Sequence, residues 1–386
     1  MSHQTTKNRR QFLRQAGTCA AAVSLGSVIP QVKADPPATD CKNPIPRWRG
    51  FNLLNFFQAF DRSTRSDGII PEDDLRWIRD WGFDFVRIPM DYWLWIDSDW
   101  RETRELSPGD MDKINEEAMS RVDRTVELGV QFGLHVSLNF HRGPGYCINN
   151  PEREPFVLWS NPRAEEAFVA HWDMFAKRYR DVPVDKLSFN LLNEAPRPRK
   201  GYMSREDYRR VMTGATEAIR KHTPDRTIII DGLSVGNMVV DEMISTGVSQ
   251  SVHAYTPAGI SHYRASWVDK DGSFPTPTWP LLNQNGTVKA SRETLEQHYA
   301  PWGELARSGI GVHCGEGGSY SRTPADVFYA WMTDVLEILH SHEIGWALWN
   351  LRGSFGLVDS GRTDIEYEDW REHKLDRRLL TLLQEH

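Results

Sequence analysis

Two glutamates that follow short apolar runs could carry acid–base chemistry. Glu194 comes directly after Asn193 in the stretch KLSFNLLNEAPRPRK, where the two prolines cannot continue the preceding strand. Glu316 ends a second run, GVHCGE. A pair of carboxylates flanking a bond suits glycoside hydrolysis, because one protonates the departing oxygen while the other attacks or stabilises the oxocarbenium-like centre. The two residues therefore predict a glycosidase if the fold brings them together.

This reaction needs the two glutamates in opposite protonation states. We expect Arg87, near the end of the run FDFVRIP, to lie beside Glu316 and to hold it ionised as the nucleophile. Glu194 has no evident cation of its own, so we expect it to stay protonated and to act first as acid and then as base. The amide of Asn193 is suited to donate to a sugar 2-hydroxyl.

A regular alternation of strands and helices is expected to position these residues. Short β-rich runs alternate with amphipathic helical patterns that begin at Pro, Ser, Asn or Asp and that often end at Gly. The runs cover residues 48–54, 83–89, 133–140, 187–193, 227–232, 251–255, 311–316 and 345–350. Eight strands separated by helices predict an α/β fold, a (β/α)8 TIM barrel in a single domain.

A barrel of this kind places its chemistry at the C-terminal ends of the strands, where the strand-to-helix loops form one face. Polar and aromatic residues occupy these ends: Arg87, His141, Asn193, Glu194, His253, Tyr255, Glu316, Trp349 and Asn350. Any one of them could instead cap a helix or satisfy a backbone group. Together they predict one cleft.

Tryptophan is abundant, with 15 residues, and flat rings on loops can stack on sugar faces. Trp267 and Trp279 lie in the irregular segment SHYRASWVDKDGSFPTPTWPLLNQNG, and both are candidate sugar platforms. The alternative is that they anchor this loop to the barrel. The same ambiguity applies to Trp93, Trp95 and Trp159.

Six motifs in order, VRIP, NFHRGPGY, LLNEA, HAY, GEGG and WALWN, resemble those of glycoside hydrolase family 5, the cellulase-like retaining enzymes. The resemblance implies that Glu194 is the acid/base, that Glu316 is the nucleophile, and that no cofactor is needed. It also implies that Trp349 floors the subsite of the cleaved sugar, with a cis peptide bond to Asn350. The supporting residues that it implies are Arg87, His141, Asn193, His253 and Tyr255.

The substrate stays open within this resemblance. A β-1,4-glucan is the first choice, and β-mannan or another β-glycan is the alternative. Endo and exo action are not distinguished, because that depends on whether loops close the cleft. The sequence has NEA where Asn-Glu-Pro is commoner and GEGG where Gly-Glu-Phe-Gly is commoner, and these departures bear on the shape of the cleft.

The N-terminal residues predict export. Arg9 and Arg10 precede a short, weakly apolar run and an A-x-A-like site near Ala34, which indicates a twin-arginine signal peptide over residues 1–34. A basic N-terminal arm is the alternative. We expect a linker over 35–46, a catalytic domain over 47–386, and a periplasmic or extracellular enzyme. Of the cysteines left after cleavage, Cys41, Cys147 and Cys314, we expect one bridge or none.

Composition and charge limit the classes of binding partner that we expect. The chain has 386 residues with a net charge of −7 and no long basic block, which argues against nucleic acid or an anionic membrane, and we expect a monomer that binds an oligo- or polysaccharide. Two rivals are a metal-dependent hydrolase that uses His141, His253 and His313, and a barrel that only binds. Strand alternation predicts that His313 points away from the mouth and that Cys314 points into the barrel, and both glutamates are present.

Overall fold

The structure is a computed structural model that describes residues 42–59 and 68–386. The predicted signal peptide, Cys41 and most of the predicted linker lie outside the described residues. None of the helices in the described part of the chain combines the length and the apolar character that a membrane-spanning helix needs.

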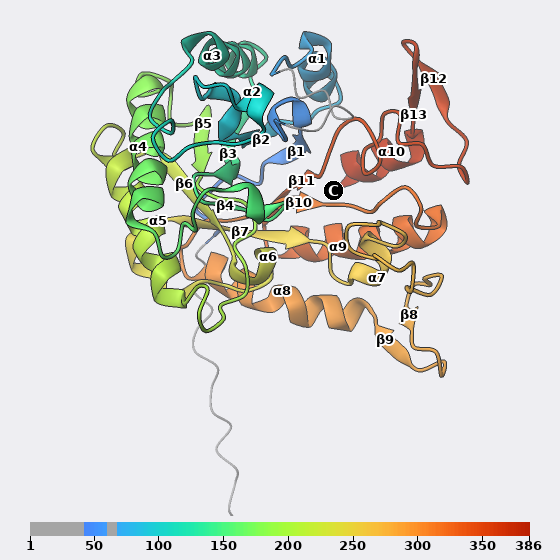
Figure 1. Cartoon of the computed structure of the whole chain (residues 1–386). Coiled ribbons are helices and arrows are strands. Elements are labelled where there is room, and N and C mark those ends of the chain that lie inside the picture. Colours follow the sequence, from blue (N-terminus) through green and yellow to red (C-terminus); the bar gives the residue numbers. More distant parts are fainter. Residues whose placement is uncertain (1–41, 60–67) are drawn as a thin grey trace, which may run out of the picture. The chain divides into compact units, whose positions relative to one another are not determined.

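Eight parallel strands close into a barrel (Figure 1). Their hydrogen-bonded order is β2-β1-β11-β10-β7-β6-β5-β3, and a further pairing of β2 with β3 closes the ring. The strands are β1 (Arg49–Asn52), β2 (Phe85–Asp91), β3 (His135–Gly143), β5 (Leu187–Asn190), β6 (Thr227–Asp231), β7 (Ser249–Ala254), β10 (Val312–Gly317) and β11 (Gly345–Leu348). Each overlaps a predicted run, so the predicted (β/α)8 barrel is confirmed.

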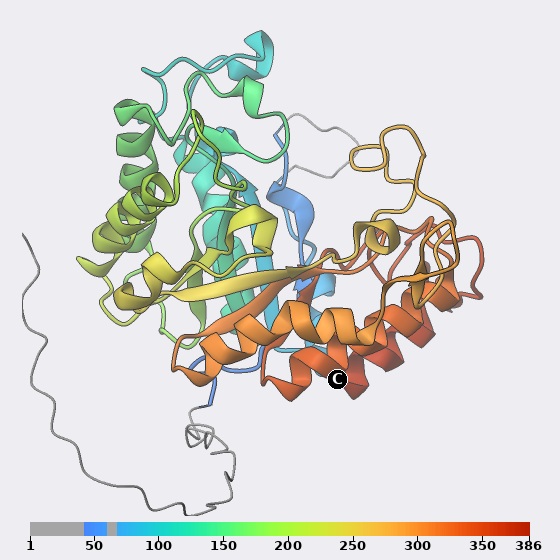
Figure 2. The same cartoon turned by 90° about the horizontal axis from the view of Figure 1, so that it is seen from below.

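Amphipathic helices surround the barrel. They are α1 (Glu72–Asp80), α3 (Glu116–Gln131), α4 (Pro162–Arg178), α5 (Arg205–Arg220), α8 (Arg292–Arg307), α9 (Ala325–Ser341) and α10 (Arg377–Glu385). Polar side chains fix several starts: Asn115 accepts from Ala118 N, and Ser204 forms a capping box with Asp207. Figure 2 shows α8 and α9 side by side on one flank.

Shorter elements decorate the loops. They are α2 (Trp100–Thr103), α6 (Leu233–Gly236), α7 (Ala258–Ser261), the strands β4 (Tyr146–Cys147), β8 (Leu281–Leu282), β9 (Val288–Ala290), β12 (Glu368–Trp370) and β13 (His373–Leu375), and the 3-10 turns η1 (Leu54–Phe56), η2 (Tyr92–Trp95), η3 (Pro151–Arg153) and η4 (Asp241–Thr246). The connection from β6 to β7 holds only α6 and η4, so this crossover lacks the long helix that strict alternation predicts.

The bottom of the barrel is filled by rings. Trp48 stacks on His135 at 3.8 Å between ring centroids, and Phe85 lies 4.6 Å from His313. Burial lowers the pKa of His313 to about 3, and its Nε2 lies 3.2 Å from the carbonyl oxygen of Trp48. Because packed rings fill the bottom of the barrel, the opposite ends of the strands are left for chemistry.

Strand alternation mispredicts one cysteine. The register shifts between Cys314 and Glu316, so an added residue changes the alternation on β10. A Cβ on Gly315 would point into the interior, 3.6 Å from Nε of Arg87. Cys314 therefore faces the helices and not the interior. Cys147 and Cys314 are both free and buried, which leaves a bridge between these two unformed.

Candidate active site

The loop after β5 and the strand β10 bring the two glutamates together. One carboxylate oxygen of Glu194, one of Glu316 and a ring nitrogen of His253 all lie within 4.8 Å of one another. Glu316 is buried, with 3 % of its side chain exposed, and 17 % of the Glu194 side chain is exposed. The two carboxylates thus share a site but differ in solvation.

Glu316 is held by two donors. Nη1 of Arg87 lies 2.7 Å from Oε1, and the Tyr255 hydroxyl donates to Oε2 at 3.0 Å. Burial raises the pKa of Glu316 to about 7, although the charges of His253 and Arg87 act to lower it. The predicted Arg87 contact is therefore present, but burial outweighs its effect on the pKa.

Arg87 is itself fixed by a ring of amides. Its Nε donates to Asn190 at 2.8 Å, its Nη1 to Asn52 at 2.9 Å and its Nη2 to Asn193 at 2.8 Å. The Oδ1 atom of Asn193 is thereby used. Its buried Nδ2 has no hydrogen-bond partner among the described residues, so a donor remains free beside Glu194.

Glu194 adopts a left-handed backbone conformation, with φ of 47°. A non-glycine residue there costs roughly 1 to 3 kcal/mol and persists only where its surroundings impose it. Three contacts do so: Glu194 N donates to Asp231 at 3.0 Å, the Tyr146 hydroxyl donates to Glu194 O at 2.7 Å, and Val235 N donates to Ala195 O at 2.9 Å. Strands β6 and β4 and the turn α6 thus aim this side chain.

His253 links the carboxylates. Its Nδ1 lies 3.0 Å from Oε1 of Glu194 and 3.7 Å from Oε2 of Glu316, and its Nε2 lies 3.1 Å from Oδ2 of Asp231. Burial alone would lower the pKa of His253, but the charges of Glu316 and Asp231, together with the side-chain contacts to Asp231 and Glu194, raise it to about 10. The expectation that Glu194 has no cation of its own is therefore wrong, because β7 supplies one that the sequence pattern did not pair with it.

The rings of His141, Trp349 and Phe57 pack together in an aromatic cluster. The ring centroid of His141 lies 6.0 Å from Trp349 and 4.3 Å from Phe57, and Phe57 lies 5.2 Å from Trp349. Burial, with Arg87 nearby, holds the pKa of His141 well below its ordinary value, so this imidazole is neutral. Trp349 is half-buried, which leaves part of its ring open.

The peptide bond after Trp349 differs from the expectation. In the described residues the cis bonds precede Pro257 and Pro280, so the predicted cis bond between Trp349 and Asn350 is wrong. A cis bond without proline costs about 3 to 4 kcal/mol, a cost that the trans bond avoids. Asn350 is buried, and its Oδ1 has no partner in the described part of the chain.

The two candidate platform tryptophans, Trp267 and Trp279, have different surroundings. Trp267 is 52 % exposed, and its ring lies 5.1 Å from Tyr320 and 6.4 Å from Phe355. Trp279 instead donates its indole N–H to Asp334 of α9 at 2.7 Å, which favours the anchoring alternative. Trp93, Trp95 and Trp159 are at most 1 % exposed and belong to the core.

Sequence reasoning did not single out Asp231, Tyr146 or Phe57. Asp231 ends its strand in TIIIDG, so the strand-end rule could have found it. Tyr146 lies in the quoted motif NFHRGPGY, but its role depends on β4 folding back on β3. Nothing in the residues around Phe57 predicted its contact with His141.

The cluster of Glu194, His253 and Glu316 is also the only group of side chains, within residues 42–59 and 68–386, close enough to hold a metal ion. His253 faces three carboxylates and is protonated at neutral pH, and an imidazolium has no lone pair for a metal. His313, the third histidine of the metal alternative, lies at the bottom of the barrel. The geometry therefore fits acid–base chemistry better than metal ligation.

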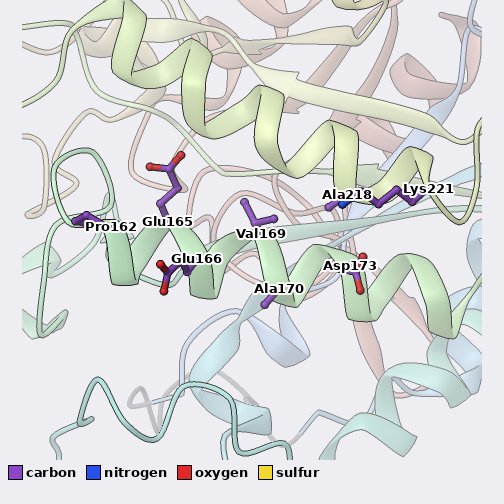
Figure 3. Close-up of a pocket in the computed structure, with 8 residues that line it drawn as sticks. All are labelled: Pro162, Glu165, Glu166, Val169, Ala170, Asp173, Ala218 and Lys221. Atoms are coloured by element: carbon purple, nitrogen blue, oxygen red, sulfur yellow. The ribbon is translucent and has the colours of Figure 1, made fainter.

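A separate groove lies on the outer surface between α4 and α5 (Figure 3). Its lining comes from these two helices and from Lys221, which directly follows α5, and it includes Glu165, Val169 and Asp173. The site residues above do not line it.

Comparisons with known proteins identify relatives of this chain. The profile of the family Cellulase (glycosyl hydrolase family 5) matches residues 43–354. Endoglucanase C of Acetivibrio thermocellus is 24 % identical over 83 % of this chain and 95 % of its own length. Cellodextrinase A of Ruminococcus flavefaciens is 25 % identical over 77 % of this chain and 83 % of its own.

Solved structures share the fold. A crystal structure described as a glycoside hydrolase is 37 % identical, with a TM-score of 0.80, and covers 88 % of this chain and 99 % of that one. The Cel5A endoglucanase of Thermotoga maritima is 22 % identical, with a TM-score of 0.67 over 87 % of this chain and 96 % of that one. The chain is a glycosyl hydrolase and belongs to the cellulase family, glycosyl hydrolase family 5.

Proposed function

We propose that this enzyme hydrolyses a β-1,4-glucan with retention of configuration, with Glu316 as nucleophile and Glu194 as acid/base. One observation carries the proposal: the two glutamates have carboxylate oxygens within 4.8 Å of each other. Retaining enzymes hold their carboxyl groups about 5 to 5.5 Å apart, whereas inverting enzymes leave about 6.5 to 9.5 Å for a water molecule.

In the first step the Glu316 carboxylate attacks the anomeric carbon while Glu194 gives its proton to the glycosidic oxygen. The bond to the leaving sugar breaks, and a covalent glycosyl ester forms on Glu316. Tyr255 and Arg87 orient the attacking carboxylate through their contacts at 3.0 and 2.7 Å. The 3.0 Å contact of His253 places the acid and stabilises the charge that it gains on losing its proton.

In the second step Glu194, now ionised, takes a proton from water. The resulting hydroxide-like oxygen attacks the anomeric carbon, and the bond to Glu316 breaks, which restores both residues. Because Glu194 must serve as acid and as base, its position has to be the same in both steps. The contacts to the backbone of Glu194 from Asp231 and Tyr146 support that requirement.

Sugar recognition is assigned to groups that remain open around the carboxylates. The free Nδ2 of Asn193 would donate to the 2-hydroxyl, and the free Oδ1 of Asn350 would accept from another hydroxyl. Trp349, with the neutral His141 beside it, would form the floor of the subsite. Trp267 would be a platform further along the cleft.

The choice of a glucan is supported by the names of the relatives, an endoglucanase and a cellodextrinase. Endo action is proposed on the same ground. Hydrolysis of β-mannan in preference to a glucan, or release of single glucose units, would replace this choice without changing the chemistry.

The test is a panel of soluble substrates, namely carboxymethyl cellulose, xyloglucan, β-mannan and an aryl β-cellobioside. We expect the wild type to cleave the glucans and Glu194→Gln and Glu316→Gln to be inactive with unchanged melting temperatures. Glu304→Gln, on the exposed face of α8, is the matched control and should keep full activity. Near-normal rates for Glu316→Gln would refute the assignment.

We also propose that residues 1–34 direct export of the enzyme through the twin-arginine route and that the mature enzyme is a periplasmic or extracellular monomer. Residues 35–46 would be a linker to the catalytic domain of residues 47–386. The support is the Arg9-Arg10 pair ahead of the short apolar run and the A-x-A-like site at Ala34.

A further inference from the structure

We propose that Asp231 is a positioning residue whose carboxylate fixes both the backbone of Glu194 and the imidazole of His253, and whose charge sets the pH range in which the two glutamates work. The inference rests on the proposed function, which gives Glu194 and Glu316 their roles.

One oxygen of Asp231 makes both contacts. Oδ2 accepts the backbone N–H of Glu194 at 3.0 Å and lies 3.1 Å from Nε2 of His253. Oδ1 accepts from Asn190 at 2.9 Å, and Nη2 of Arg87 lies 3.5 Å from Oδ2. The Asp231 side chain is fully enclosed, with 0 % exposed, so it cannot touch a substrate and must act through its neighbours.

Charges of both signs surround His253. The groups that face it are the carboxylates of Asp231, Glu194 and Glu316, the guanidinium of Arg87, the phenol of Tyr255 and the neutral imidazole of His141. Burial would raise the pKa of Asp231, but the charge of His253, its contact with His253 and the charge of Arg87 hold it below its ordinary value. Asp231 and His253 therefore form a buried ion pair whose cationic end faces both glutamates.

Loss of the Asp231 charge would weaken that cation. His253 would release its proton at a lower pH, and both glutamates would then lose a positive neighbour. Removing Asp231 also removes a repulsion from Glu316, but His253 has the larger effect on the pKa of Glu316, because it lies 3.7 Å away. Once His253 loses its proton within the pH range of activity, the loss of this cation exceeds the loss of the repulsion, and the acidic limb of the pH profile moves upward.

The first test compares Asp231→Asn with Tyr208→Phe in the full chain, by kcat/KM against pH on an aryl β-cellobioside. Asp231→Asn keeps the shape of the side chain and removes the charge. We expect its acidic limb to rise by about 1 pH unit and its maximal rate to fall.

Tyr208→Phe is the local control, because the Tyr208 hydroxyl donates to the Asp231 carbonyl oxygen at 2.7 Å without touching the carboxylate. This variant should lower the melting temperature and leave both limbs in place. If Asp231→Asn lowers the rate at every pH without moving the acidic limb, Asp231 is only structural and the inference fails. An acidic limb that moves downward would show that His253 keeps its proton without Asp231, which would also overturn the inference.

A second measurement uses the wild type and needs no activity. In protein labelled with 15N-histidine, the His253 signals are assigned by their loss in His253→Gln. We expect an imidazole with both nitrogens protonated from pH 6 to pH 9. Release of a proton within this range would overturn the inference, whereas absence of β-glycan hydrolysis by the wild type would overturn only the proposed function.

Discussion

As the proposed nucleophile, Glu316 has to be an anion in a place where burial opposes charge. Its side chain is 3 % exposed, and burial raises its pKa to about 7 although His253 and Arg87 both stabilise the ionised form. An ordinary glutamate ionises near pH 4.3. The acidic limb of activity is therefore expected near neutrality, and it reports the coupled pair of glutamates and not Glu316 alone.

Replacing Arg87 should move this limb. In Arg87→Met the Glu316 carboxylate loses a cation at 2.7 Å, so its pKa rises and the acidic limb of kcat/KM moves up by about 1 pH unit or more. The matched control is Arg87→Lys, which keeps the charge but loses the three amide contacts. It should lower the rate with a smaller shift. If the acidic limb lies at the same pH in the wild type and in Arg87→Met, Arg87 does not support the ionisation of Glu316.

Some of this site could be predicted from residue order alone. Glu194, Glu316 and Arg87 stand at strand ends, and a barrel gathers strand ends into one face. The pairing of His253 with Glu194 could not be predicted, because it depends on which side chains lie closest across the open end of the barrel. The left-handed backbone of Glu194 could not either, since glutamate has no local preference for positive φ.

At the scale of elements, the orientation of the Glu194 side chain depends on a short strand and a short crossover. The Tyr146 hydroxyl, on β4, donates to Glu194 O, and Val235, in α6, donates to Ala195 O. The crossover from β6 to β7 has no long helix, and α6 occupies its start instead. Elements outside the regular alternation therefore hold the proposed acid.

We expect Tyr146→Phe to lower kcat about 5-fold with little change in KM, because one hydrogen bond of about 1 kcal/mol holds the acid and not the substrate. Tyr299→Phe is the control, since this buried hydroxyl on α8 has no partner among the described residues. It should leave kcat unchanged. A pure KM effect for Tyr146→Phe would mean that the hydroxyl serves binding.

The loop after β7 should separate binding from stability. Trp267→Ala should raise KM for cello-oligosaccharides roughly 5-fold, the loss expected for about 1 kcal/mol of stacking, and should leave the melting temperature unchanged. Trp279→Phe should do the reverse, because its indole bond to Asp334 holds the loop on α9. A KM effect of Trp279→Phe as large as that of Trp267→Ala would restore both as platforms.

Strands and long helices could be predicted because their periodicity is strong, and every barrel strand fell on a predicted run. The direction in which the Cys314 side chain points could not be predicted, because a pattern of alternating side chains does not reveal the irregularity on β10. The fates of Trp267 and Trp279 likewise depend on how an irregular loop folds over the barrel.

At the scale of the whole molecule, the barrel of the described residues accounts for the chemistry without residues 1–34. A variant that starts at residue 35 should have the same kcat and KM as the full chain. In a host with a twin-arginine pathway, replacing Arg9 and Arg10 together by Lys should leave the full chain in the cytoplasm, as cell fractionation would show. Unchanged export would favour the basic-arm alternative for these residues.

The most direct test of the central claim is the configuration of the first product. An aryl β-cellobioside is hydrolysed in an NMR tube, and the anomeric proton of cellobiose is followed before mutarotation mixes the anomers. Double displacement through an ester on Glu316 predicts that the β anomer appears first. The α anomer appearing first would mean direct attack by water and would contradict the proposed role of Glu316.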